Sequence, residues 1–227
     1  MNSEYYIDYE GLAYNSKIFP QKYYHRERVK RFSKYIHKGK YFLDIGCGSG
    51  LILSKSKSKI SIGTDIDKKT IKSNILNKFF KKNTFFVICD AQKLCFKPNL
   101  FDLIVCTHVI EHLEKPGEMI DDCKRILRSG GYLLLETPNY YSFWPIIESL
   151  WSLLPRSRNY FKHHLRHFTI NKIKQLIYDS GLKLENISTF QSILMINEKM
   201  VDIFRGLDNF ISSKNLGMKL FLKIRKI

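Results

Sequence analysis

Five short apolar runs recur between residues 41 and 137, separated by longer amphipathic segments. Each run is continuously hydrophobic, which is typical of strands that are buried on both faces of a parallel sheet. The runs predict strands over Tyr41–Ile45, Ile60–Thr64, Thr84–Ile88, Phe101–Cys106 and Tyr132–Thr137. The intervening segments predict helices over Ser49–Ser56, Asp67–Lys81 and Pro116–Leu127, a turn over Ala91–Leu94, and a helix end at Ser129-Gly130-Gly131. This alternation indicates an α/β fold with a parallel sheet and helices on both faces.

The segments on either side of this core predict further elements. A basic helix is expected over Gln21–Ile36, with an apolar side formed by Tyr24, Val29, Phe32 and Ile36. After the aromatic connection Asn139–Phe168, the pattern predicts helix Thr169–Ser180, strand Leu182–Phe190, helix Ile196–Ile211 and strand Leu216–Ile227. We therefore expect a single domain over residues 1–227, comprising a helical extension (1–40), a core (41–137), a lid (138–168) and a C-terminal region (169–227).

The composition adds charge and redox information. The chain has 38 Lys+Arg against 21 Asp+Glu among 227 residues, a formal net charge of +17. This favours nucleic acid, phospholipid or a phosphorylated substrate as partner, although a lysine-rich solvated surface gives the same number. The five cysteines form no Cys-x-x-Cys pair, which indicates a reducing compartment. The first twelve residues hold no apolar leader, and no run reaches the roughly 18 apolar residues of a spanning helix, so we expect a cytoplasmic location.

The most specific motif is a glycine-rich loop after the first predicted strand, Asp44-Ile-Gly46-Cys-Gly48-Ser-Gly50. Glycines permit a tight turn and let a ligand approach the main chain where a Cβ would collide. The spacing differs from the dinucleotide fingerprint, whose third glycine would fall at Leu51, and no Gly-Lys-Ser/Thr of a P-loop follows. Because Asp44 would repel a phosphate, the loop favours a ligand that carries an ammonium or sulfonium group.

Acidic residues also follow the second and third predicted strands. Asp65 comes about twenty residues after the loop, where an acid is placed to hold ribose hydroxyls. Asp90 is suited to an adenine amino group, whereas we expect Asp67 to cap the next helix. Ligands of open α/β sheets bind at this carboxyl edge, so the acids together indicate a nucleoside site.

These motifs, in this order, resemble those of class I S-adenosylmethionine-dependent methyltransferases, and the chain is similar to small-molecule and glycan enzymes such as the ubiquinone-biosynthesis O-methyltransferases. The resemblance runs from about Tyr24 to the C-terminus. It rests on Leu43–Gly50, Gly63–Ile66, Cys89–Ala91, Phe101–Leu113 and Arg125–Leu133. It implies a Rossmann-like seven-stranded, mostly parallel sheet with an antiparallel last strand, a lid insertion after strand five, and S-adenosyl-L-methionine as cofactor.

The resemblance also implies roles for individual residues. Asp44 and the loop backbone would hold the methionine part of the cofactor, and Asp65 would bind the ribose. Ile66 would lie against the adenine, with Asp90 and Ala91 at its rim. The implied cofactor-binding set is Asp44, Gly46, Cys47, Gly48, Gly50, Asp65, Ile66, Asp90, Ala91, Thr107 and His108.

Two groups of histidines invite a metal interpretation. His108-Val-Ile-Glu111-His112 spells the H-x-x-E-H of a zinc protease, but that motif needs a helix and His108 follows a buried strand. His163, His164 and His167 have no acidic or cysteine ligand close in sequence. We therefore assign no metal ligand.

We instead expect His108, His112 and His167 to take part in catalysis. His167, ahead of His164, is the expected base for a hydroxyl proton, since the ordinary histidine pKa of about 6.5 lies near working pH. Positioning of the acceptor without a base, and a merely solvated basic loop at 163–168, are the alternatives.

Residues 140–166 combine apolar and aromatic side chains with a basic continuation. They include Trp144, Trp151, Arg156, Arg158, Lys162 and Arg166. Tryptophans beside cations are typical of a segment that contacts a membrane surface, although a lid packed on the core or a dimer contact would look similar. Together with the basic first helix, the segment favours a small-molecule, glycan or lipid-linked acceptor and peripheral membrane contact.

The expected function is methyl transfer, most favourably to oxygen, and other classes stay open. An RNA methyltransferase would use the charge, but the Asn/Asp-Pro-Pro-Tyr/Phe motif of base-amino enzymes is absent from Cys106-Thr-His-Val109. A protein methyltransferase and a non-catalytic binding subunit are further alternatives. The intact loop and strand-end acids weigh against the latter.

Overall fold

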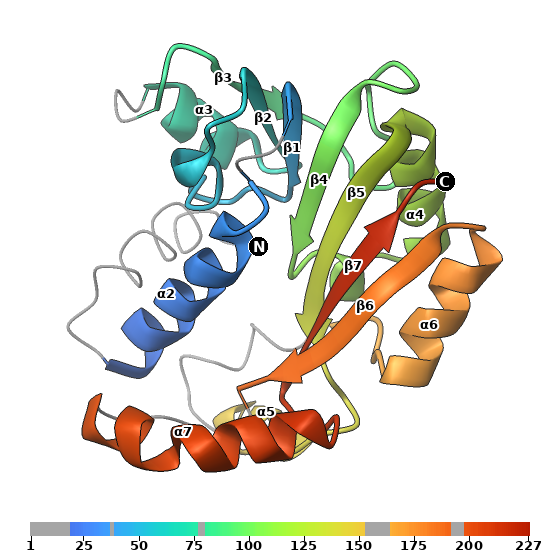
Figure 1. The fold of residues 1–227 in the computed structure, drawn as a ribbon. Helices are drawn as coiled ribbons and strands as arrows, with labels where there is room; N and C mark the ends of the chain where they lie inside the picture. Colours follow the sequence, from blue (N-terminus) through green and yellow to red (C-terminus); the bar gives the residue numbers. More distant parts are fainter. Residues whose placement is uncertain (1–18, 37–38, 77–79, 153–163, 192–197) are drawn as a thin grey trace.

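A computed structural model describes residues 19–36, 39–76, 80–152, 164–191 and 198–227. Its strands are β1 (Tyr41–Ile45), β2 (Ile60–Asp65), β3 (Thr84–Ile88), β4 (Phe101–Thr107), β5 (Leu127–Pro138), β6 (Lys183–Phe190) and β7 (Lys219–Arg225). They form one seven-stranded sheet in the order β3-β2-β1-β4-β5-β7-β6 (Figure 1). Strands β1 to β5 pair in parallel, whereas β7 runs antiparallel to both β5 and β6. The predicted Rossmann-like α/β class and antiparallel last strand are confirmed.

Helices cover both faces of this sheet. They are α2 (Phe19–Ser33), α3 (Lys68–Leu76), α4 (Pro116–Ile126), α5 (Trp144–Ser152), α6 (Ile170–Asp179) and α7 (Glu198–Ser213), with 3-10 turns η2 (Leu53–Lys55) and η3 (Ile110–His112). The arrows of β4 and β5 point toward the end of the sheet near which α2, α5 and α7 lie (Figure 1). None of the described helices is both long and apolar enough to span a bilayer.

The core consists of two apolar clusters, because successive strand residues point to opposite faces. In β4, Leu103 and Val105 join the cluster that contains side chains of α2 and α3. Ile104 and Cys106 join the other, which contains side chains of α4 and α6. Every residue of β4 is buried, which explains why its sequence is apolar throughout.

The structure corrects the predicted elements around the glycines. The predicted helix over Ser49–Ser56 is wrong, because the chain forms turns and η2 there. Gly50 has a φ of 73°, which a right-handed helix cannot contain. The predicted glycine end of α4 is also wrong, since that helix stops at Ile126 and β5 begins at Leu127. Gly130 instead adopts a φ of 76° and donates its N–H to the Lys226 carbonyl at 2.8 Å.

Other element boundaries shift by a few residues. Helix α3 ends at Leu76, short of the predicted Lys81. In the N-terminal helix, Val29, Phe32 and Ile36 are buried as expected, while the side chain of Tyr24 lies outside the described part. The predicted lid is described only at its two ends: Trp151 belongs to α5 but its side chain is not described, and Arg156, Arg158, Lys162 and His163 lie outside the described residues.

Candidate functional site

The glycine loop follows β1 at the carboxyl edge of the sheet, and its glycines make room for the protein's own side chains. Gly46 has a φ of 64°, and a Cβ there would lie 2.2 Å from Cγ2 of Val109. A Cβ on Gly50 would lie 2.5 Å from the Phe80 ring. Asp44, at the end of β1, is buried. The loop is thus shaped by packing against neighbouring segments, in addition to any ligand.

Asp65 joins the end of β2 to this loop. Its Oδ2 accepts a hydrogen bond from the Gly48 N–H at 3.1 Å, and its Oδ1 accepts from the Asp67 N–H at 3.0 Å. Burial raises the pKa of Asp65 above its ordinary value, against the lowering effect of these backbone hydrogen bonds. Asp67 caps α3 as predicted, accepting from the Thr70 N–H at 2.9 Å. The ribose-binding candidate Asp65 is therefore joined to the glycine loop, the methionine-binding candidate, by a direct hydrogen bond.

The neighbouring edge at β2 and β3 is open to solvent. Ile66 is 70% exposed, although it directly follows β2, whose residues are buried or half-buried. Asp90 is also exposed and accepts from the Gln92 N–H at 2.8 Å, while Ala91 is half-buried. An exposed aliphatic side chain beside an acid is suited to one face of an adenosine. The predicted adenine contacts thus lie on an accessible surface.

On the other side of the loop, His108 lies between two buried carboxylates. It follows Thr107, the buried last residue of β4, and has a φ of 54°, which is uncommon for a non-glycine residue. Its Nδ1 lies 3.1 Å from Oε1 of Glu111, and its Nε2 lies 3.1 Å from Oε1 of Glu136. Both carboxylates are fully buried. The strained backbone directs the imidazole to a place where it bridges η3 and β5.

The imidazole keeps both carboxylates ionised. Burial opposes the charge of Glu111, but the hydrogen bond and electrostatic interaction with His108 outweigh it and lower the pKa of Glu111 to about 2. The pKa of Glu136 is lowered in the same way, with help from Arg28 and Lys219. Sequence reasoning missed Glu136, although a glutamate at the end of the apolar run 133–135 is a signal that could have found it.

Basic groups from distant segments also approach this cluster. Helix α2 buries His25 and Arg28, whose Nδ1 and Nη2 lie 3.0 Å apart. Burial, with the nearby charge of Arg28, lowers the pKa of His25 to about 3. Lys219, at the start of β7, is buried and lies 4.0 Å from the centroid of the Trp144 ring. The first predicted helix therefore contributes to the site as well as to the core.

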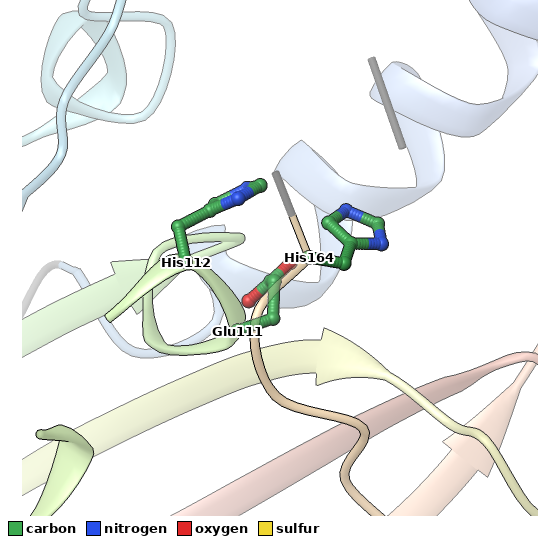
Figure 2. Close-up of side chains that lie close together, drawn as sticks. All are labelled: Glu111, His112 and His164. Atoms are coloured by element: carbon green, nitrogen blue, oxygen red, sulfur yellow. The ribbon is translucent and has the colours of Figure 1, made fainter. Parts of the chain in front are cut away.

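The remaining candidate histidines separate into two groups. The rings of His112 and His164 have centroids 4.9 Å apart, and both lie near Glu111 (Figure 2). His164 is buried, and its Nδ1 lies 2.9 Å from the Tyr140 hydroxyl. His167 is exposed and stacks on the Tyr140 ring at 4.1 Å. The structure thus brings His164, rather than the expected base His167, into the buried cluster.

The side chains along this edge suit S-adenosyl-L-methionine. Carboxylates such as Asp44 and Asp65 match an ammonium group and ribose hydroxyls, and Ile66 offers an apolar surface to adenine. The His108 cluster lies next to the same loop, since Val109 packs against Gly46. The arrangement therefore places titratable side chains beside the expected position of a methyl donor.

Comparisons with known proteins agree with this geometry. A family described as "Methyltransferase domain" matches residues 14–187. A ubiquinone biosynthesis O-methyltransferase of Coxiella burnetii is 27% identical over 159 residues, which cover 66% of this chain and 67% of that protein.

Solved structures show the same fold. A putative methyltransferase of Haloferax volcanii, in complex with the Trm112 methyltransferase activator, has a TM-score of 0.68 at 14% identity, covering 96% of this chain and 97% of that one. A methyltransferase from Archaeoglobus fulgidus has a TM-score of 0.64 at 22% identity, covering 90% and 94%. Because the family match spans most of the sequence, this chain belongs to the methyltransferase domain family, with the class I Rossmann-like fold and S-adenosylmethionine as the cofactor that this family implies.

Proposed function

We propose that this protein transfers a methyl group from S-adenosyl-L-methionine to an oxygen of a small-molecule, glycan or lipid-linked acceptor. The observation that carries the proposal is the contact between Asp65 and the Gly48 N–H, which unites the ribose-binding acid with the methionine-binding loop. When bound, the cofactor supplies an electrophilic methyl group on a sulfonium. The chain's own residues would orient it and the acceptor for in-line displacement.

We assign a different role to each of the four histidines near this edge. Both ring nitrogens of His108 contact buried carboxylates, so we assign it to positioning of the loop and of Glu111. Burial lowers the pKa of His164 to about 4, which makes it a weak base at neutral pH. We retain His167 as the base for the acceptor hydroxyl, because it is exposed and held on Tyr140. His112 is half-buried and would line the acceptor side.

The exposed side chains just before α5 and in its first turn support this class of acceptor. Tyr141, Phe143 and Ile146 are all exposed there. Exposed aromatic and aliphatic side chains favour contact with a lipid surface over contact with RNA. We propose that this surface gives the protein peripheral membrane contact and access to a lipid-linked precursor.

Labelled methyl transfer tests the proposal. The wild-type chain and Asp65→Ala would be incubated with methyl-labelled S-adenosylmethionine and fractionated cell extract. We expect label in the organic-soluble or glycan fraction with the wild type, and strongly reduced label with the variant. Label confined to RNA or protein would overturn the acceptor class, and no transfer to any fraction would favour a binding subunit.

A further inference from the structure

Three potential metal ligands from two separate segments converge beside the carboxyl ends of β4 and β5 (Figure 2). Glu111 and His112 belong to η3, and His164 precedes α6. One ligand atom from each lies within 4.8 Å of the other two. The Arg166 N–H donates to the Glu111 carbonyl at 3.0 Å, which fixes the second segment on the first. We propose that these three side chains form a binding site for a divalent transition-metal ion.

Neighbouring groups hold two of the ligands in place. Glu111 accepts from the Thr137 hydroxyl at 3.1 Å through Oε2, and its Oε1 lies 3.1 Å from His108. The Tyr140 hydroxyl lies 2.9 Å from Nδ1 of His164 and holds the imidazole in its orientation. Outer contacts of this kind orient metal ligands and are a common feature of metal sites.

The ligand set selects the class of metal. Two imidazoles and one carboxylate suit Zn²⁺, Fe²⁺ or Co²⁺ better than Mg²⁺, which prefers oxygen ligands. A metal bonded at about 2.1 Å would draw the three donors together. Three protein ligands also leave further coordination positions for water or an acceptor oxygen.

The role of the metal, but not its binding, rests on the proposed function. A bound divalent cation would lower the pKa of an acceptor hydroxyl that coordinates it, because the cation stabilises the alkoxide or phenolate. The acceptor would then give up its proton more readily to His167 or to water. This favours an acceptor with a metal-binding hydroxyl.

Metal titration tests the site directly. The full chain would be stripped with a chelator, kept reduced, and titrated with Zn²⁺ by calorimetry and with Co²⁺ by visible absorption. We expect one equivalent to bind, with affinity at least about tenfold weaker in His164→Gln and in His112→Gln. His112 is half-buried, so its variant keeps the test valid if His164→Gln fails to fold. His167→Gln is the matched control and should bind as the wild type does.

Three results would overturn the proposal. The first is the absence of one-to-one binding at millimolar Zn²⁺, and the second is binding by both variants that is as tight as in the wild type. The third is a Co²⁺ spectrum with thiolate bands, which would place the metal at the cysteines. Stoichiometric binding that depends on His112, together with a lack of methyl transfer, would contradict the proposed function and support the metal site.

Discussion

His108 shows how much a single residue determines at this site. Its positive φ costs energy, of order 1–3 kcal/mol, which the surrounding contacts must offset. The contacts of the imidazole with two fully buried carboxylates, Glu111 and Glu136, offset this energy. Strain of this kind is concentrated at functional sites, and its position next to the glycine loop agrees with a positioning role.

Replacement of His108 should therefore lower the stability of the fold even when the new residue tolerates a positive φ. We predict that His108→Asn, which tolerates a positive φ, lowers the free energy of unfolding by at least about 2 kcal/mol, because two buried carboxylates lose a partner. Urea unfolding measures the effect. The exposed His167→Asn should change stability by less than about 0.5 kcal/mol. Equal stability of the two variants would show that the bridge contributes little.

Asp65 is the second residue whose role can be isolated. We predict that Asp65→Ala weakens S-adenosylmethionine binding about 10–100-fold, since hydrogen bonds to a charged group contribute roughly 1.5–3 kcal/mol. Calorimetry measures the affinity. Asp67→Ala is the control: it removes the cap of α3, costs about 1 kcal/mol of stability, and should leave the affinity nearly unchanged. Unchanged affinity in Asp65→Ala would refute the ribose assignment.

At the scale of elements, α5 and the turn before it carry the question of membrane contact. The exposed apolar side chains Tyr141, Phe143 and Ile146 lie within six residues of one another, whereas the +17 charge is spread over the whole chain. Apolar burial, in addition to charge, is what retains an interfacial helix on a lipid surface. The charge alone would not distinguish this surface from others.

A vesicle assay separates these contributions. We predict that the wild type is retained on anionic phospholipid vesicles and that the double variant Phe143→Ser and Ile146→Ser is released, because it loses apolar area that would enter the interface. Tyr178→Ser, an exposed aromatic on α6, is the matched control and should be retained. Cosedimentation measures all three. Failure of the wild type to sediment would rule out the contact.

At the scale of the whole molecule, the buried titratable groups predict how stability depends on pH. The pKa values of His25 and His164 are lowered to about 3 and about 4, against about 6.5 in an unfolded chain. Between pH 6.5 and about 4 the unfolded chain takes up protons that the folded chain does not. The free energy of unfolding must therefore fall as the pH is lowered through this range. Glu111 causes a further fall in the free energy of unfolding between about pH 4.5 and 2, because its carboxylate takes up a proton in the unfolded chain before it does so in the folded one.

Urea unfolding as a function of pH checks this prediction. We expect the midpoint concentration to fall steadily below pH 6.5 in the wild type and less steeply in His164→Gln, which removes one of the two histidines. A flat profile between pH 6.5 and 4.5 would show that neither imidazole stays neutral in the folded protein. Metal bound at His164 would steepen the same profile, so the measurement is made after chelation.

The sequence by itself determined the α/β architecture of this protein and the carboxyl edge at which we propose that the cofactor binds. Strands buried on both faces must be apolar, so β1, β4 and the inner part of β5 are visible as short continuous runs. The glycine loop and the acids at Asp65 and Asp90 follow those runs directly, because parallel strands end at one edge. The local sequence pattern gave wrong predictions at two glycines. Gly50 was expected inside a helix and Gly130 at the end of one, but both have a positive φ and lie outside any helix.

Only the tertiary structure decided which titratable groups meet beyond that edge. Glu136 lies 28 residues after His108, and His164 belongs to a segment 52 residues after His112, so no local pattern relates them. Buried groups of this kind are selected by mutual hydrogen bonding and charge, which depend on distances across the fold. The bridge at His108, the approach of Arg28 from α2 and the cluster of Glu111, His112 and His164 are consequences of that packing.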